Sequence, residues 1–98
     1  MVQRYTADCG IVGGGAAGLA AAAFLSRLSG GKISSVVLEK GPRVGKKLLA
    51  TGNGTCNLSN IHAAPSHYHG TDPRFAAPTL AAFPPAEPVA FFTSIGVE

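Results

Sequence analysis

The feature that most constrains the fold of this chain is a glycine-rich turn between two apolar runs. Residues 11–18 read IVGGGAAG, and they contain the pattern G-x-G-x-x-G as Gly13, Gly15 and Gly18. The run before the turn, 7–12, is small and apolar and predicts a short buried strand. The run after it, 16–28, is rich in alanine, the best helix former, and predicts a helix. The pattern therefore has the strand-before, helix-after context that distinguishes a phosphate-binding turn from a chance match.

A second strand completes the unit. Gly30 and Gly31 follow the predicted helix, where glycine commonly ends a helix. Residues 34–39, SSVVLE, then form an apolar run bounded by turn residues, which predicts a second strand. Strand, glycine turn, helix and strand in this order predict a βαβ unit over 7–39 with parallel strands, and hence an α/β fold of the Rossmann-like type.

Each glycine of the pattern has a predicted role in binding a dinucleotide. Gly13 makes the tight turn out of the strand, Gly15 lets a pyrophosphate approach the backbone, and Gly18 lets the helix pack closely on the sheet. The helix N-terminus offers backbone N–H groups and a partial positive charge to the phosphates. The other predicted cofactor-binding residues of the turn are Gly14, Ala16 and Ala17.

Glu39 ends the second predicted strand, about 20 residues after the glycine pattern, where a dinucleotide fold places the acidic residue that binds a ribose. Its carboxylate can accept hydrogen bonds from both ribose hydroxyls of an adenosine. It would repel a 2′-phosphate, so the sequence disfavours NADP at this site. The alternative is a glycine-rich helix start with an unrelated surface glutamate.

Half of the eight Lys and Arg residues lie in one short segment, as Lys40, Arg43, Lys46 and Lys47. This cluster is either a solvated loop or a local attraction for a phosphate-bearing ligand. The net charge is only +3, and a nucleic-acid surface normally shows a wider basic stripe. We therefore predict no nucleic-acid partner.

The uncharged run 9–25 resembles the apolar region of a signal peptide. Five glycines interrupt it, and it is shorter than the roughly 20 residues of a membrane span, so we predict no membrane association. Cys9 and Cys56 are far apart and form neither a disulfide framework nor a CxxC pair. This cysteine usage predicts a reducing, cytoplasmic location.

The rest of the chain predicts less regular structure. A short helical turn is expected at 46–50, mostly loop at 51–70, and helices at 73–83 and 85–95. Three histidines fall in or near the loop, but no carboxylate set accompanies them, so we predict a polar surface rather than a metal site. These histidines are His62, His67 and His69.

The segment 36–60, VVLEKGPRVGKKLLATGNGTCNLSN, carries a long and specific resemblance. Together with the glycine turn it resembles the start of the bacterial NAD(P)/FAD-dependent oxidoreductases also called HI0933-like or BaiN-like flavoproteins. Their block reads approximately G-[RK]-K-[LI]-x-x-[ST]-G-[GN]-G-R-C-N-x-[ST]-N. This chain departs from it at Thr55, where the family usually has arginine. The matching residues are Gly45, Lys46, Lys47, Leu48, Thr51, Gly52, Asn53, Gly54, Cys56, Asn57, Ser59 and Asn60.

The resemblance implies a glutathione-reductase-like FAD-binding domain, of which 1–98 would be the N-terminal portion. The glycine turn would face the FAD pyrophosphate, Glu39 the adenosine ribose, and the segment 45–60 the flavin end. Asn57 would bond flavin heteroatoms, and Cys56 is favoured as a small packing residue over a reactive thiol. The predicted cofactor-binding residues beyond the glycine turn are Glu39, Lys40, Lys47, Gly52, Asn53, Gly54, Cys56 and Asn57.

Family members are several times longer, so the chain is expected to be a fragment that binds FAD weakly and turns over nothing. No residue is predicted as a catalytic acid or base. In a full-length protein NAD(P)H would be a possible electron donor to the flavin. Three alternatives stay open: an NAD-binding dehydrogenase module, a flavin-dependent RNA-modifying protein, and a non-catalytic remnant.

Overall fold

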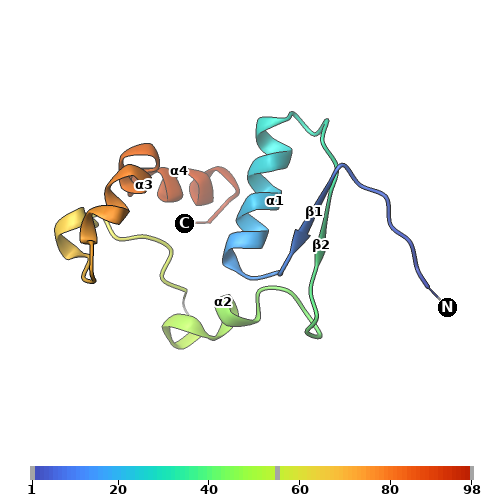
Figure 1. Cartoon of the computed structure of the whole chain (residues 1–98), viewed down its shortest axis with the longest axis horizontal. Helices are drawn as coiled ribbons and strands as arrows, with labels where there is room; N and C mark the ends of the chain where they lie inside the picture. The colour runs from blue at the N-terminus through green and yellow to red at the C-terminus, as the bar shows by residue number, and fades with distance from the viewer. Residues whose placement is uncertain (1, 55, 98) are drawn as a thin grey trace. The chain divides into compact units, whose positions relative to one another are not determined.

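A computed structural model describes residues 2–54 and 56–97 of the chain. The chain forms two compact units, Met1–Cys56 and Asn57–Glu98, which are considered separately below. Figure 1 shows the order of the elements along the chain.

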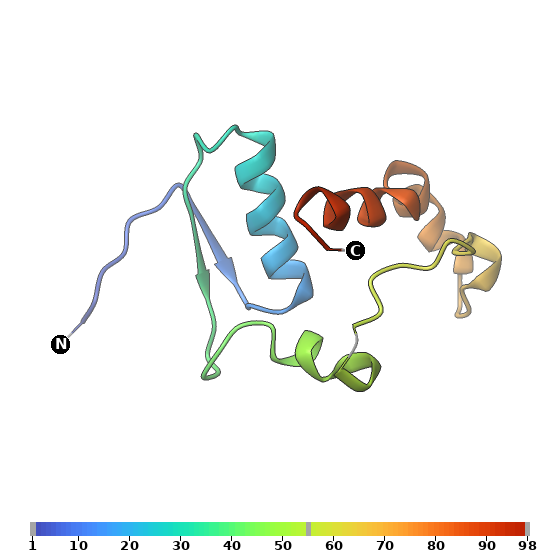
Figure 2. The same ribbon diagram turned by 180° about the vertical axis from the view of Figure 1, so that it is seen from behind.

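The first unit is a βαβ unit with parallel strands, as the sequence predicts. Strand β1 (Cys9–Val12) leads through the glycine turn into helix α1 (Ala16–Leu28), and the chain returns in strand β2 (Ser35–Leu38). The helix contacts both strands and covers one face of the pair, as Figure 2 shows from behind. The paired residues are Cys9 with Ser35, Gly10 with Val36, Ile11 with Val37 and Val12 with Leu38.

Both strands are shorter than predicted, because side chains take over the pairing at one end. Ser34 Oγ accepts a hydrogen bond from the Asp8 amide at 3.0 Å, and Asp8 Oδ2 accepts from the Ser34 amide at 2.9 Å and from the Ser34 hydroxyl at 3.0 Å. These bonds stabilise the ionised carboxylate and lower the pKa of Asp8, the Ser34 amide having the largest effect. Reciprocal hydrogen bonds between Asp8 and Ser34 therefore hold together the end of the strand pair that lies away from the glycine turn.

Helix α1 ends at the predicted glycines. Gly30 and Gly31 have positive φ angles of 64° and 77°, which glycine adopts at no steric cost. The Gly30 amide bonds to the Arg27 carbonyl at 3.2 Å and the Gly31 amide to the Ser26 carbonyl at 2.8 Å. These bonds satisfy carbonyl groups that the last helical turn leaves open.

The first unit has little core. Among the described residues no hydrophobic side chain is fully buried, and Val12 and Leu38 are 89% and 50% exposed. Parallel strands in Rossmann-type folds are usually covered on both faces, whereas helix α1 covers only one face of this pair. The margin of stability is therefore small, and a single steric clash in the glycine turn has a large effect.

The second unit contains short helical segments. A 3-10 turn at Pro65–His67 is followed by a second at Pro73–Ala76, helix α3 (Ala77–Ala82) and helix α4 (Ala86–Ser94). The predicted helix over 73–83 is thus divided in two. Pro78 lies in the first turn of α3, where its missing N–H and fixed φ are tolerated, but it prevents one continuous α-helix.

Caps define the ends of these helices. Asp72 accepts a hydrogen bond from the Arg74 amide at 3.2 Å and pairs with the Arg74 guanidinium at 2.9 Å. Gly96, with a φ of 94°, ends α4 as predicted, and the Val97 amide bonds back to the Phe92 carbonyl at 3.0 Å. In the part of the chain that the structure describes, no helix has the length and apolar character needed to cross a membrane.

Candidate nucleotide-binding site

The glycine turn follows directly from the end of β1, and two of its glycines are required by the backbone. Gly13 has a φ of 102°, a region that side chains rarely allow, and its amide continues the strand pairing to the Leu38 carbonyl at 2.8 Å. A Cβ on Gly18 would overlap the carbonyl oxygen of Gly13 and come within 3.3 Å of Ile11 Cγ2. Helix α1 therefore starts in direct contact with the strand, which only glycine permits.

Gly15 is different, because the fold itself does not require a glycine there. It is the N-cap of α1 with a φ of −84°, and a Cβ built on it meets no atom within 4 Å. The helix has no side-chain cap and no acidic residue in its first turn. The open space beside Gly15 thus lies next to the backbone N–H groups at the start of α1, which is where a dinucleotide pyrophosphate would lie.

Glu39 lies directly after β2, and its carboxylate bonds to the glycine turn. Oε1 accepts from the Gly14 amide at 3.0 Å, and Oε2 accepts from the Gly41 amide at 2.6 Å. The Gly41 bond is the larger cause of a lowered Glu39 pKa; the Gly14 bond adds to it, and the charge of Lys40 contributes least. The carboxylate is therefore ionised at neutral pH, and each oxygen keeps a further lone pair for a ribose hydroxyl.

The loop after Glu39 turns back onto the glycine turn. The Gly45 amide donates to the Gly14 carbonyl at 2.7 Å, and Gly45 adopts a left-handed φ of 68° before helix α2 (Lys46–Ala50). This arrangement brings the loop 41–45, and Lys46 after it, to the same side as the glycine turn. No local sequence pattern predicts this contact, because Gly14 and Gly45 are distant in sequence.

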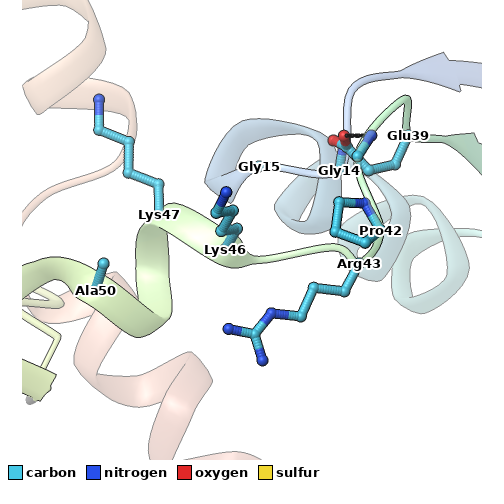
Figure 3. Close-up of a pocket in the computed structure, with 9 residues that line it drawn as sticks. Gly14, Gly15, Glu39, Pro42, Arg43, Lys46, Lys47 and Ala50 are labelled. Atoms are coloured by element: carbon cyan, nitrogen blue, oxygen red, sulfur yellow. Dashed lines mark hydrogen bonds between the residues drawn. The ribbon is translucent and has the colours of Figure 1, made fainter.

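A pocket of about 410 Å³ lies where these segments meet (Figure 3). In Figure 3 the Lys46 ammonium lies on the side of the glycine turn, whereas Arg43 and Lys47 extend in other directions. Within residues 2–54 and 56–97, none of these three cationic side chains makes an ion pair or a hydrogen bond. The pocket is lined by Gly14, Gly15, Glu39, Gly41, Pro42, Arg43, Lys46, Lys47 and Ala50.

The pocket combines three groups that suit an adenosine diphosphate. Backbone N–H groups at a helix start and cationic side chains attract phosphate oxygens. The carboxylate of Glu39 accepts hydrogen bonds from hydroxyl groups. One small volume therefore offers donors for phosphates beside an acceptor for a sugar.

The structure brings some of the predicted site residues together and not others. The pocket is lined by four of them, Gly14, Gly15, Glu39 and Lys47. Gly13 and Gly18 shape the glycine turn but do not line the pocket. The charge of Lys40 contributes to the lowered pKa of Glu39. Ala16 and Ala17 are the first residues of α1. The predicted residues that do not line the pocket are Gly13, Ala16, Ala17, Gly18, Lys40, Gly52, Asn53, Gly54, Cys56 and Asn57.

The flavin-side segment begins with an unusual turn. Within Thr51–Gly54, Gly52 and Asn53 have φ angles of 58° and 56°, so two successive residues are left-handed. Glycine and asparagine are the residues that tolerate this conformation best, which explains why they occur here. Cys56, a half-buried free thiol, ends the first unit.

Two further predicted features of this segment are not part of the described site. Asn57 begins the second unit and is exposed. Thr55, the position where the chain departs from the family block, lies outside the described residues.

Sequence reasoning missed several lining residues. Lys46 and Arg43 belong to the predicted basic cluster but not to the predicted site, and Gly41, Pro42 and Ala50 were not singled out as ligands. The signal that points to them is the pair of glycines that frames the loop, at 41 and 45. A glycine before and after a basic segment indicates a loop held close to another backbone.

The described residues contain no group of three or more His, Cys, Asp and Glu side chains that could hold a metal ion. Cys9 in β1 is half-buried, and its thiol is free.

A parallel βαβ unit whose glycine turn opens on this pocket defines a nucleotide-binding domain of the Rossmann class. More specifically, the chain belongs to the HI0933-like family: residues 7–98 match the HI0933-like protein Rossmann domain.

Curated relatives agree with this assignment. The chain is 48% identical over 88 residues to a 3-dehydro-bile acid delta(4,6)-reductase of Clostridium scindens, which covers 90% of this chain and 21% of that protein. It is 42% identical over 73 residues to a ribosomal RNA dihydrouridine synthase of Haemophilus influenzae, covering 74% of the chain and 18% of the relative. The corresponding enzyme of Escherichia coli is 36% identical over 83 residues, covering 84% and 19%. The chain thus spans about a fifth of the length of these relatives.

Proposed function

We propose that this chain binds the adenosine diphosphate half of FAD and supplies the cofactor-binding start of a flavin-dependent oxidoreductase. The observation that carries the proposal is the open space at Gly15 beside the ionised Glu39 carboxylate in one pocket. The family assignment supports the same class of protein. A flavin, when bound, supplies the hydride and electron transfer, and the protein binds and orients it.

Each part of the pocket has a proposed task. The N–H groups at the start of α1 bind the pyrophosphate, and Lys46, which lies on the side of the glycine turn, neutralises its charge. Lys47 lines the same pocket and adds to the positive charge there. Glu39 accepts hydrogen bonds from the ribose hydroxyls and repels a 2′-phosphate. Gly52 to Asn57 is proposed to lie toward the flavin, where the left-handed turn exposes backbone groups to a flat ring.

The whole protein's reaction is a wider proposal. NAD(P)H is the proposed electron donor, and both free cysteines fit a reducing, cytoplasmic setting. The 48% identity to a 3-dehydro-bile acid delta(4,6)-reductase favours a reductase activity for the whole protein.

A second candidate function is modification of RNA, favoured by the identity to two ribosomal RNA dihydrouridine synthases. Against it, the one cluster of basic residues in the sequence lies within 40–47, where three of its members line the pocket, and it does not extend into a wide stripe. Both candidates require the same FAD site, so the test of FAD binding applies to either.

Lys46→Gln tests the proposed phosphate contact. Loss of the ammonium that faces the glycine turn is expected to weaken FAD binding about threefold to tenfold and to flatten its dependence on salt. Fluorescence titration of FAD at two salt concentrations measures both effects.

Lys32→Gln is the matched control, because Lys32 precedes β2 at the end opposite Glu39. If the two variants weaken FAD binding equally, Lys46 acts only through net charge and the proposed contact is wrong.

A further inference from the structure

The loop 41–45 and Glu39 use both polar backbone groups of Gly14. The Gly14 amide donates to Glu39 Oε1 at 3.0 Å, and its carbonyl accepts from the Gly45 amide at 2.7 Å. The other oxygen of Glu39 holds the first residue of the loop, Gly41, at 2.6 Å. Both ends of the loop are thus tied to one residue of the glycine turn, directly or through one carboxylate.

The middle of the loop is also fixed there. A Cβ built on Gly14 would lie 2.6 Å from Val44 Cγ1, 3.1 Å from Val44 Cβ and 3.4 Å from Glu39 Cβ. Val44 therefore fills the space that a side chain at position 14 would need. Gly14 and Gly45 are the buried residues of this region, although Val44 itself is 46% exposed.

We propose that Glu39 and Val44 are positioning residues that clamp the loop 41–45 onto Gly14 in the ligand-free chain, and so hold Lys46, which follows the loop, beside the glycine turn before a ligand arrives. The clamp consists of the three hydrogen bonds and the Val44–Gly14 contact described above. Its effect on cofactor affinity rests on the proposed function, whereas the clamp itself does not.

The clamp gives Glu39 a task besides the proposed ribose contact. A loop that carries several cations but has no fixed position would have to be ordered by the phosphates, which reduces affinity. A loop already fixed to Gly14 avoids that loss. The missing side chain at Gly14 then has a reason unrelated to the pyrophosphate, because it makes room for Val44.

Amide hydrogen exchange in the ligand-free 98-residue chain tests the clamp. The amides of Gly14, Gly41 and Gly45 are expected to exchange at least about tenfold more slowly than those of an unstructured chain. Glu39→Gln should speed exchange at Gly14 and Gly41, while the strand amide of Cys9, which donates to the Ser34 carbonyl at 3.1 Å, reports whether the whole unit has opened. Unprotected amides at Gly41 and Gly45 in the unmodified chain would overturn the proposal.

A double-mutant cycle tests the Val44 contact. Gly14→Ala is expected to speed exchange at Gly45 about tenfold and to weaken FAD binding by a similar factor, because the new methyl group displaces Val44. Adding Val44→Ala removes the methyl group in conflict and should restore much of both. Gly10→Ala, at an open strand position, is the matched control.

The cycle separates the clamp from the cofactor. If the amide of Gly45 exchanges as fast in the double variant as in Gly14→Ala, the clamp is contradicted. Rescue of exchange in a chain that binds no FAD contradicts the proposed function and still supports the clamp.

Discussion

Gly15→Val is expected to abolish FAD binding while leaving the chain folded. The position has an ordinary negative φ of −84°, and a Cβ there meets no protein atom within 4 Å, so the fold accepts a side chain. The same space is where a pyrophosphate would approach the start of α1. A valine fills it, and we expect the affinity to fall at least about a hundredfold.

Equilibrium titration of FAD, with circular dichroism as the check on folding, measures this result. Gly10→Val is the control, since Gly10 lies in β1 and also has open space around its α-carbon. Unchanged FAD affinity in Gly15→Val would show that the ligand does not cross this turn.

Gly18→Ala, unlike Gly15→Val, is expected to unfold the first unit. The added methyl group would overlap the carbonyl oxygen of Gly13, which is backbone and cannot rotate away. Forcing the helix from the strand costs about 3 kcal/mol, a large part of the stability of a small domain. The chain has no fully buried hydrophobic side chain among its described residues to offset that loss.

Thermal unfolding and two-dimensional NMR spectra of the ligand-free chain measure the effect. Gly15→Ala, three positions earlier, is the control and should keep the folded spectrum because its methyl group meets nothing. Equal thermal stability of the two alanine variants would mean that α1 does not pack on Gly13 as described.

The local parts of this fold could be predicted from sequence because they depend on neighbouring residues. Residues 16–28 form the predicted helix with its predicted bounds, and the glycines that stop it adopt positive φ angles. Parallel pairing followed from the order of elements and is confirmed. The second unit was predicted less well, since Pro78 divides one expected helix into a 3-10 turn and α3.

The candidate site was predicted only in part, for a physical reason. Gly15 and Glu39 belong to a pattern with a known spacing, so sequence reasoning could name them. The return of Gly45 to Gly14 is a tertiary contact between residues far apart in sequence, and no periodicity encodes it. Lys46 therefore lines the pocket without having been predicted as a site residue, although the sequence placed it in the basic cluster.

Competition between nucleotides tests the central claim most directly, namely that the pocket recognises the adenosine diphosphate half of FAD. The unmodified 98-residue chain is titrated with FAD by fluorescence, and ADP or FMN is then added as competitor. We expect weak, saturable FAD binding that ADP reverses at comparable concentration and FMN does not, because the described pocket offers a carboxylate for a ribose and donors for a pyrophosphate. Displacement of FAD by FMN but not by ADP, or no FAD binding at all, would contradict it.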